Sequence, residues 1–153
     1  MAPVYEIKRY TSQQQSAWDA LVETSVNGTF LFKRDYMEYH AHRFVDFSLM
    51  VYSKNKPVAL LPASIRDGEV TSHGGLTYGG FVVASELTSV QLLDIFEVVV
   101  QYFKKEGITC WYYKPVPHIY HSYLCDGEMY ALYRLRATRI ACNLSSTIDL
   151  SAP

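Results

Sequence analysis

The stretch Ser72-His73-Gly74-Gly75-Leu76-Thr77-Tyr78-Gly79-Gly80, here called the glycine segment, holds four of the chain's eight glycines between two runs that read as strands. Glycine weakens a strand, so it is used where a bulge forms or where another backbone or a ligand approaches closely. The pattern therefore predicts either a strand opened for a ligand, or a tight turn with a bulge and no ligand.

Length and composition predict one soluble domain. A chain of 153 residues can bury a core without a disulfide or a metal to hold it together. Its 14 basic and 15 acidic residues give a net charge of −1, unlike a protein that binds the nucleic-acid backbone. No apolar run reaches the ~20 residues of a membrane span. Cys110, Cys125 and Cys142 have no Cys-x-x-Cys spacing, and free thiols in a reducing cytoplasm are the simplest explanation.

Hydrophobic periodicity predicts strands that alternate with helices. Strands are expected at residues 4–10, 47–52, 58–65, 69–73, 78–83, 108–113 and 144–150. Helices are expected from residue 11 or 12 to the break at 27–28, and at 29–40, 89–107 and 126–139. The clearest helix begins at Ser89, and its inward stripe is Leu92, Phe96, Val99 and Phe103. This order predicts an α/β fold of the α+β type: a single domain whose mixed central sheet has helices on both faces.

A second group of polar side chains follows the strand expected at 108–113. Its members lie on a loop stiffened by prolines, and they are Lys114, His118, Tyr120, His121 and Tyr123. The ordinary pKa of histidine is close to neutral, so His121 is a candidate general base. Lys114 can neutralise a phosphate or carboxylate of a substrate. The alternative is that the histidines are surface or packing residues and that the lysine is solvated.

Several motifs together resemble the GNAT-fold acyltransferases, and more closely the N-terminal domain of the FemAB-like proteins, which carry two such domains in tandem. Besides the glycine segment, the motifs are Asn27-Gly28-Thr29-Phe30-Leu31, Leu60-Leu61-Pro62-Ala63 and Lys114-x-x-Pro117-His118-Ile119-Tyr120-His121. The resemblance implies that residues 1–153 form one GNAT-like domain, the N-terminal half of a longer tandem protein.

The resemblance also implies acyl or aminoacyl transfer from a thioester or ester to an amine. In the GNAT fold two parallel strands splay apart for the donor, and here these would be residues 76–83 and 108–113. A turn of the form Gln/Arg-x-x-Gly-x-Gly/Ala then holds the donor pyrophosphate at a helix N-terminus. This chain instead has Val83-Ala84-Ser85-Glu86-Leu87-Thr88-Ser89, with no glycine and no basic residue. No cofactor is therefore assigned, and a coenzyme A thioester stays an open alternative.

The predicted site combines the glycine segment with the loop after residue 113. The catalytic candidates are His121, His73 and Tyr120. The substrate-binding candidates are Gly74, Gly75, Tyr78, Gly79, Gly80, Lys114, His118 and Tyr123. No metal is expected, because His118-x-x-His121 and His40-x-His42 lack companion ligands at metal-binding spacing.

Two functions of different class remain from the sequence. The first is the acceptor-side domain of a FemAB-like acyltransferase, acting on a small-molecule or peptide amine. The second is a degenerate GNAT-fold module that binds without catalysis. The expected partners are the amine acceptor and either a second GNAT-like domain or a second copy in a homodimer. No nucleic acid and no membrane span are expected.

Overall fold

One bent β-hairpin runs through both sheets of the molecule. The computed structural model describes residues 5–39, 41–144, 146 and 148. In it, β3 (Leu49–Ser53) pairs antiparallel with β4 (Lys56–Leu61). The two arms of this hairpin continue as β2 (Val45–Asp46) and β5 (Ala63–Arg66), which pair in a second sheet.

The remaining strands extend the two sheets to four strands each, in the orders β1-β3-β4-β7 and β2-β5-β6-β8. Strand β1 (Tyr5–Arg9) pairs antiparallel with β3, and β7 (Val82–Val83) pairs antiparallel with β4. Strand β6 (Glu69–Ser72) is antiparallel to β5, whereas β8 (Cys110–Tyr112) is parallel to β6. The mixed sheet that the sequence predicts is therefore present.

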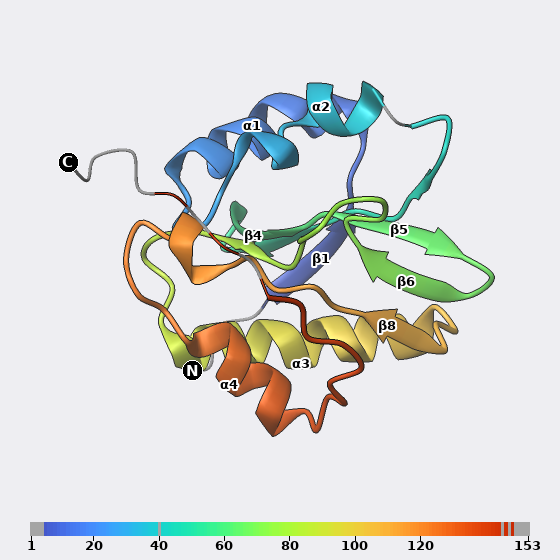
Figure 1. The fold of residues 1–153 in the computed structure, drawn as a ribbon. Helices are drawn as coiled ribbons and strands as arrows, with labels where there is room; N and C mark the ends of the chain where they lie inside the picture. The colour runs from blue at the N-terminus through green and yellow to red at the C-terminus, as the bar shows by residue number, and fades with distance from the viewer. Residues whose placement is uncertain (1–4, 40, 145, 147, 149–153) are drawn as a thin grey trace.

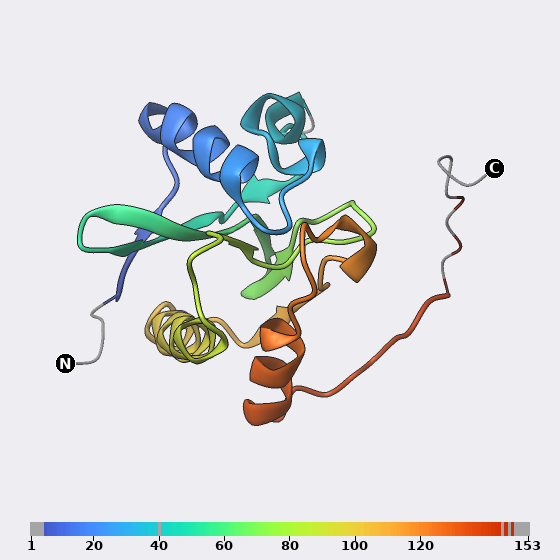
Figure 2. The same ribbon diagram turned by 90° about the vertical axis from the view of Figure 1, so that its left-hand side faces the viewer.

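Helices cover both sides of the strands (Figures 1 and 2). On one side lie α1 (Gln15–Thr24) and α2 (Arg34–Tyr39), and on the other lie α3 (Ser89–Lys105) and α4 (Gly127–Arg134). Three short 3₁₀ turns connect them: η1 (Ser12–Gln14), η2 (Phe30–Phe32) and η3 (His118–Tyr120). The predicted α/β architecture with helices on both faces is confirmed. None of the helices in the described ranges is both long and apolar enough to cross a bilayer.

The two long helices form where local sequence signals agree. Helix α3 begins at Ser89 because of a capping box: the Thr88 hydroxyl accepts a hydrogen bond from the Gln91 N–H, and Oε1 of Gln91 accepts one from the Thr88 N–H. Its predicted stripe is buried throughout, together with Ile95: Leu92, Phe96, Val99 and Phe103. In α1 the Trp18 side chain is fully buried, and its indole N–H donates to the Phe32 carbonyl at 2.7 Å.

Several predicted elements differ from the structure. The helix expected at 29–40 is divided into η2 and α2, because Lys33 between them has an extended backbone. The strand expected at 58–65 is divided between β4 and β5, which belong to different sheets. The strand expected at 78–83 is reduced to β7, so the parallel partner of β8 is β6 and not residues 76–83. Helix α4 ends at Arg134, before the predicted end at 139. Of the strand expected at 144–150, residues 145, 147, 149 and 150 lie outside the described part, and 144, 146 and 148 are exposed and belong to no strand.

Strand β7 is short because side chain and loop groups complete its hydrogen bonding. The Asn27 amide donates to the Phe81 carbonyl at 2.8 Å and accepts from the Val83 N–H at 3.1 Å. The Val26 N–H donates to the Val83 carbonyl at 3.0 Å. A buried backbone group without a partner is costly, so Asn27 takes the place of a neighbouring strand here.

We predict that Asn27→Ala destabilises the domain by about 2–4 kcal/mol, because it leaves a buried carbonyl and a buried N–H unpaired at ~1–3 kcal/mol each. Urea unfolding measures the loss. The matched control is Asn143→Ala, at an exposed position, which we expect to change the free energy of unfolding by less than about 0.5 kcal/mol. Equal losses in the two variants would contradict the role of Asn27.

Candidate functional site

The glycine segment is an excursion: the chain leaves the sheet after β6 and returns to it at β7. The β5–β6 register pairs Ala63 with Ser72, and its continuation would place Gly75 opposite Leu60. Leu60 instead pairs with Val82, seven residues further along. Strands β6 and β7 therefore lie along the same edge of the bent hairpin, with β6 beside β5 and β7 beside β4. The residues between them leave the sheet.

The glycines of this excursion are approached closely by the chain's own atoms. A Cβ atom at Gly75, where φ is +81°, would lie 2.5 Å from Cζ of Phe44. A Cβ atom at Gly79 would lie 2.6 Å from the Ser72 carbonyl oxygen. At Gly80 it would lie 2.9 Å from the hydroxyl of Tyr113. These contacts explain the glycines without a ligand, so ligand binding by their backbone remains a prediction.

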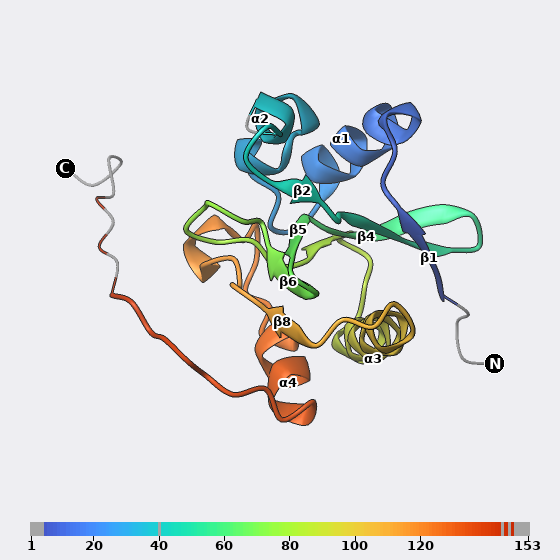
Figure 3. The ribbon, with the colours of Figure 1, turned by 90° about the vertical axis from the view of Figure 1, so that its right-hand side faces the viewer.

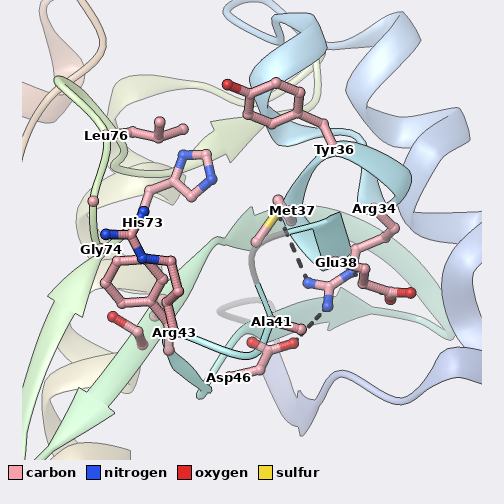
Figure 4. Close-up of a pocket in the computed structure, with 14 residues that line it drawn as sticks. Arg34, Tyr36, Met37, Glu38, Ala41, Arg43, Asp46, His73, Gly74 and Leu76 are labelled. Carbon is pink, nitrogen blue, oxygen red and sulfur yellow. Dashed lines mark hydrogen bonds and ion pairs between the residues drawn. The ribbon is translucent and has the colours of Figure 1, made fainter.

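A cavity of about 190 Å³ lies between the glycine segment and α2 (Figure 4). His73 and Leu76 project into it from the glycine segment, and Tyr36 and Met37 from α2. The other lining residues are Arg34, Glu38, Ala41, Arg43, Phe44, Asp46, Ala63, Ser64, Gly74 and Gly75. Of the predicted site residues, His73, Gly74 and Gly75 line this cavity.

Arg34 organises the charged side of the cavity. Its guanidinium is buried and forms ion pairs with Asp46, at 2.5 Å, and with Glu38, at 3.4 Å. It also donates to the Ser48 hydroxyl at 3.3 Å and lies 3.6 Å from the centre of the Tyr10 ring. A buried charge needs such partners, so Arg34 fixes the positions of both carboxylates. Sequence reasoning missed this cluster, because an arginine and a glutamate at i,i+4 on a helix are usually solvated.

His73 is a neutral histidine on the opposite side. Burial, assisted by the nearby charge of Lys114, lowers its pKa to about 4. The imidazole is therefore uncharged at neutral pH, with one nitrogen that donates and one that accepts. Its Nδ1 has no hydrogen-bond partner, and its ring lies against Phe32 with centroids 5.3 Å apart.

Lys114 ties the loop after β8 to the glycine segment. Its ammonium donates to the carbonyls of His73, at 3.0 Å, and Leu76. Its backbone carbonyl accepts from the Gly79 N–H at 2.8 Å, and its own N–H donates to the Ser72 hydroxyl at 2.8 Å. Burial lowers the pKa of Lys114. Because its ammonium donates to two carbonyls of the glycine segment, Lys114 holds this segment in place.

A row of rings joins His73 to the second predicted cluster. Phe32 contacts both His73 and Tyr78, and Tyr78 lies against Tyr120 with centroids 5.1 Å apart. The Tyr78 hydroxyl donates to Thr29 at 3.3 Å. The structure therefore brings together three predicted site residues from distant parts of the sequence, although Tyr78 and Tyr120 do not line the cavity.

The other predicted residues lie apart from the cavity. His121 Nε2 is 3.2 Å from the Val116 carbonyl oxygen, and burial lowers the pKa of this histidine. His118 lies 3.2 Å from an oxygen of Asp126. The Tyr123 hydroxyl donates to the Ser85 carbonyl at 2.9 Å. Within residues 5–39, 41–144, 146 and 148, no three His, Cys, Asp or Glu side chains are grouped to hold a metal ion.

A buried tyrosine–glutamate pair links the end of β8 to the start of β7 and to α4. The Tyr113 hydroxyl accepts from the Phe81 N–H at 2.8 Å and donates to Glu128. Burial raises the pKa of Glu128 to about 7, and burial together with the Glu128 charge raises the pKa of Tyr113 well above its ordinary value. Sequence reasoning missed this pair, because a glutamate in the first turn of a helix is normally a solvated charge.

The arrangement of the chain matches solved acetyltransferases over nearly its whole length. One is AAC(6')-Iy in complex with the bisubstrate analogue CoA-S-monomethyl-acetylneamine, with a TM-score of 0.61, 13% identity, and 95% of this chain and 99% of that chain covered. Another is aminoglycoside 6'-N-acetyltransferase AAC(6')-Ih from Acinetobacter baumannii, with a TM-score of 0.54, 15% identity, and 97% and 100% covered. This chain has the GNAT fold.

A third similar structure is that of L-PGS from Bacillus licheniformis, with a TM-score of 0.51 and 12% identity, where 80% of this chain matches 38% of that chain. No family model matches the sequence, and no curated protein matches it. At these identities the similarities show the GNAT fold, and they leave the FemAB-like relation as a proposal.

The residues at the GNAT donor site do not fit the pyrophosphate of coenzyme A. The first turn of α3 is capped by its own Thr88 and Gln91, and Glu86 precedes it in an ion pair with Lys56 at 2.5 Å. A free helix N-terminus binds anions, but here the N–H of Gln91 is occupied and a carboxylate stands nearby. The Phe81 N–H, which directly precedes β7, donates to the Tyr113 hydroxyl.

We predict that Gly75→Ala destabilises the GNAT domain more than Gly107→Ala. Both glycines have a left-handed φ, +81° and +72°, which costs a non-glycine residue ~1–2 kcal/mol. Only Gly75 also lies against a ring, that of Phe44, whereas a Cβ at Gly107 meets nothing within 4 Å. In a Phe44→Ala background the two substitutions should cost about the same in urea unfolding. A difference that persists there would exclude the Phe44 contact as its cause.

We predict that stability is highest between pH 4.5 and 6.5. The folded pKa of His73 is lowered from 6.5 to about 4, so its contribution is complete above 6.5 and is lost as pH falls toward 4. The folded pKa of Glu128 is raised from 4.5 to about 7, so stability falls as pH rises through this interval. Because the two slopes oppose each other between pH 4.5 and 6.5, thermal unfolding of the unsubstituted protein should show a plateau there. Glu128→Gln should reveal a stability that rises from pH 4 to 6.5, and His73→Gln one that falls from pH 4.5 to 7; a plateau that persists in both variants would contradict the assignment.

Proposed function

We propose that this chain is the acceptor-binding domain of an N-acyltransferase, which transfers an acyl or aminoacyl group from an ester or thioester to an amine. The observation that carries the proposal is the cavity in which uncharged His73 and the Arg34-ordered carboxylates Glu38 and Asp46 lie together. The GNAT fold, shared with N-acetyltransferases, supports amine acylation in general.

The cavity groups suit the two states of an amine. The Glu38 and Asp46 side chains are 44% and 40% exposed beyond their ion pairs with Arg34, so their carboxylates can still accept hydrogen bonds from the ammonium form. Attack requires the free amine, whose N–H can donate to an imidazole nitrogen of His73 while that ring is neutral. The amine nitrogen then bonds to the acyl carbon, the C–O or C–S bond breaks, and the amine proton leaves with the alcohol or thiol.

The size of the cavity limits what part of the acceptor it can hold. At about 190 Å³ it is smaller than the ~300–1,000 Å³ typical of pockets that hold a whole small-molecule ligand. Only the amine-bearing end of a larger acceptor fits. We therefore infer that the rest of the acceptor lies outside, against the neighbouring surface of α2 and the 41–44 loop.

The activated acyl group is supplied from outside this domain. This part of the proposal is supported by the Tyr113–Glu128 pair in the splay and by the capped first turn of α3. A tandem FemAB-like protein offers such an arrangement, because a second GNAT-like domain can carry the donor. The match of this chain to 38% of the longer L-PGS chain is consistent with a domain used within a larger protein.

The second candidate function is a GNAT-fold binding module without catalysis. It is favoured by the buried Tyr113–Glu128 pair, and by the position of two of the three catalytic candidates: neither His121 nor Tyr120 lines the cavity. In that case the cavity would still bind an amine, but no acylated product would form with any donor or partner domain.

We predict that primary amines bind the cavity and that acetyl-coenzyme A does not bind. Isothermal titration with n-hexylamine, neamine and lysine amide, and separately with acetyl-coenzyme A, measures this. Asp46→Asn removes a charge-assisted contact of ~1.5–3 kcal/mol, which corresponds to at least a tenfold loss of amine affinity. The control is His118→Ala, outside the cavity, with unchanged affinity. Absence of amine binding would overturn the proposal, and binding of acetyl-coenzyme A would overturn the external donor.

A further inference from the structure

The cavity beside α2 carries charges of opposite sign that are not all paired with each other. Arg34 holds the carboxylates of Glu38 and Asp46 on the α2 side. Arg43 lines the same cavity, yet its guanidinium forms no ion pair or hydrogen bond with any residue that the structure describes. The cavity therefore has a negative side and, apart from it, a cation without a partner. A ligand that carries both charges would match this arrangement.

The position of Arg43 is fixed through its neighbour Phe44. The loop of residues 41–44 connects α2 to β2, and Figure 3 shows β2 between α2 and β5. The Phe44 ring packs on the glycine segment so closely that a Cβ atom at Gly75 would lie 2.5 Å from its Cζ. In Figure 4 the Arg43 side chain lies on the side of the cavity where His73 and Gly74 are, away from Asp46. The loop thus presents its guanidinium beside the glycine segment.

A backbone N–H of the glycine segment supplies a second donor on this side. The Lys114 ammonium binds the His73 carbonyl, and in a trans peptide the C=O and the following N–H point in opposite directions. The Gly74 N–H therefore points away from Lys114, which does not line the cavity, whereas Gly74 does. Among the described residues, this N–H has no acceptor. Because a hydrogen bond to the carbonyl polarises the peptide, Lys114 makes the Gly74 N–H a stronger donor.

Lys114 adds positive charge on this side with no carboxylate to balance it. Burial lowers the pKa of Lys114, and none of the ion pairs in the described ranges includes Lys114 or Arg43. An opposite charge nearby would favour the charged form of a partly buried lysine. The adjacent His73 is uncharged at neutral pH, in part because of the Lys114 charge. The side of the cavity formed by His73 and Gly74 is therefore electropositive and lacks an anion.

We propose that the acceptor is dipolar: a short chain joins its amine to a carboxylate or phosphate group, and Arg43 and the Gly74 N–H bind this anionic group. A guanidinium presents a planar fork of donors that matches both kinds of anion. The amine end keeps its contacts with Asp46 and His73, which belong to the proposed function on which this inference rests. Because Arg43 is exposed, the anionic group lies at the opening of the cavity, where the rest of a larger acceptor can continue into solvent.

Isothermal titration of the full chain with two pairs of ligands tests the anionic group. The pairs are 4-aminobutanoate with 4-aminobutanamide, which have the same shape, and O-phosphoethanolamine with ethanolamine. We expect the anionic member of a pair to bind about tenfold more tightly than its neutral partner, because hydrogen bonds between two charged groups are stronger than those to a neutral group. Whichever pair shows the larger difference identifies the anion as a carboxylate or as a phosphate.

The residue responsible is tested by removing one charge at a time. Arg43→Gln should abolish the difference within each pair and leave the affinities of ethanolamine and 4-aminobutanamide unchanged. The matched control is Arg66→Gln, which removes the same charge from an exposed position of β5 outside the cavity and should preserve the difference. Loss of the difference in both variants would mean that the net charge of the protein attracts the anion, and would overturn the proposal.

The backbone amide signal of Gly74 in a ¹H–¹⁵N spectrum locates the anion. It should shift with 4-aminobutanoate and stay in place with 4-aminobutanamide. Equal affinities within both pairs, or an unmoved Gly74 signal, would overturn the dipolar acceptor while amine binding, and with it the proposed function, stands.

Failure of every amine to bind would instead overturn the proposed function. Butanoate, which has no amine, then tests the anion site separately. A Gly74 shift that Arg43→Gln removes would support the site, and no shift would exclude it.

Discussion

The strand that pairs with β5 leaves the sheet after Ser72, and the chain returns to pair with β4 at Val82, seven residues later than a continuous register would require. Most of the site is a consequence of this interruption. The backbone groups freed by the excursion need partners, which come from Asn27, Lys114 and Tyr113. The excursion also brings His73 to the side of α2, where the cavity forms.

The same interruption gives the two sides of the sheet different properties. On the α2 side it opens a small cavity with ordered carboxylates and a neutral histidine. On the α3–α4 side it lets Tyr113 reach the Phe81 N–H, because Gly80 leaves room for the hydroxyl. The cavity side is therefore open, while the α3–α4 side is filled by the chain's own Tyr113 and Glu128.

Two buried titratable groups, His73 and Glu128, have pKa values shifted by this geometry. Burial disfavours the charged form of each, so the pKa of His73 falls to about 4 and the pKa of Glu128 rises to about 7. Neither has an opposite charge bonded to its side chain among the described contacts, so each resists ionisation instead of being stabilised by it. The two shifts change stability in opposite directions as pH rises from 4.5 to 6.5.

The sequence by itself determined the elements whose signals are local. Helix α3 and its buried stripe follow from a capping box and a helical period. The glycine segment indicated a break in a strand. Those signals need only neighbours within a few residues. Only the tertiary structure decided that Phe44 covers Gly75, that Arg34 orders Glu38 and Asp46, and that Glu128 is buried on Tyr113. These contacts join residues from different elements, and burial, which no residue's own sequence neighbours specify, changes a solvated charge into part of a site.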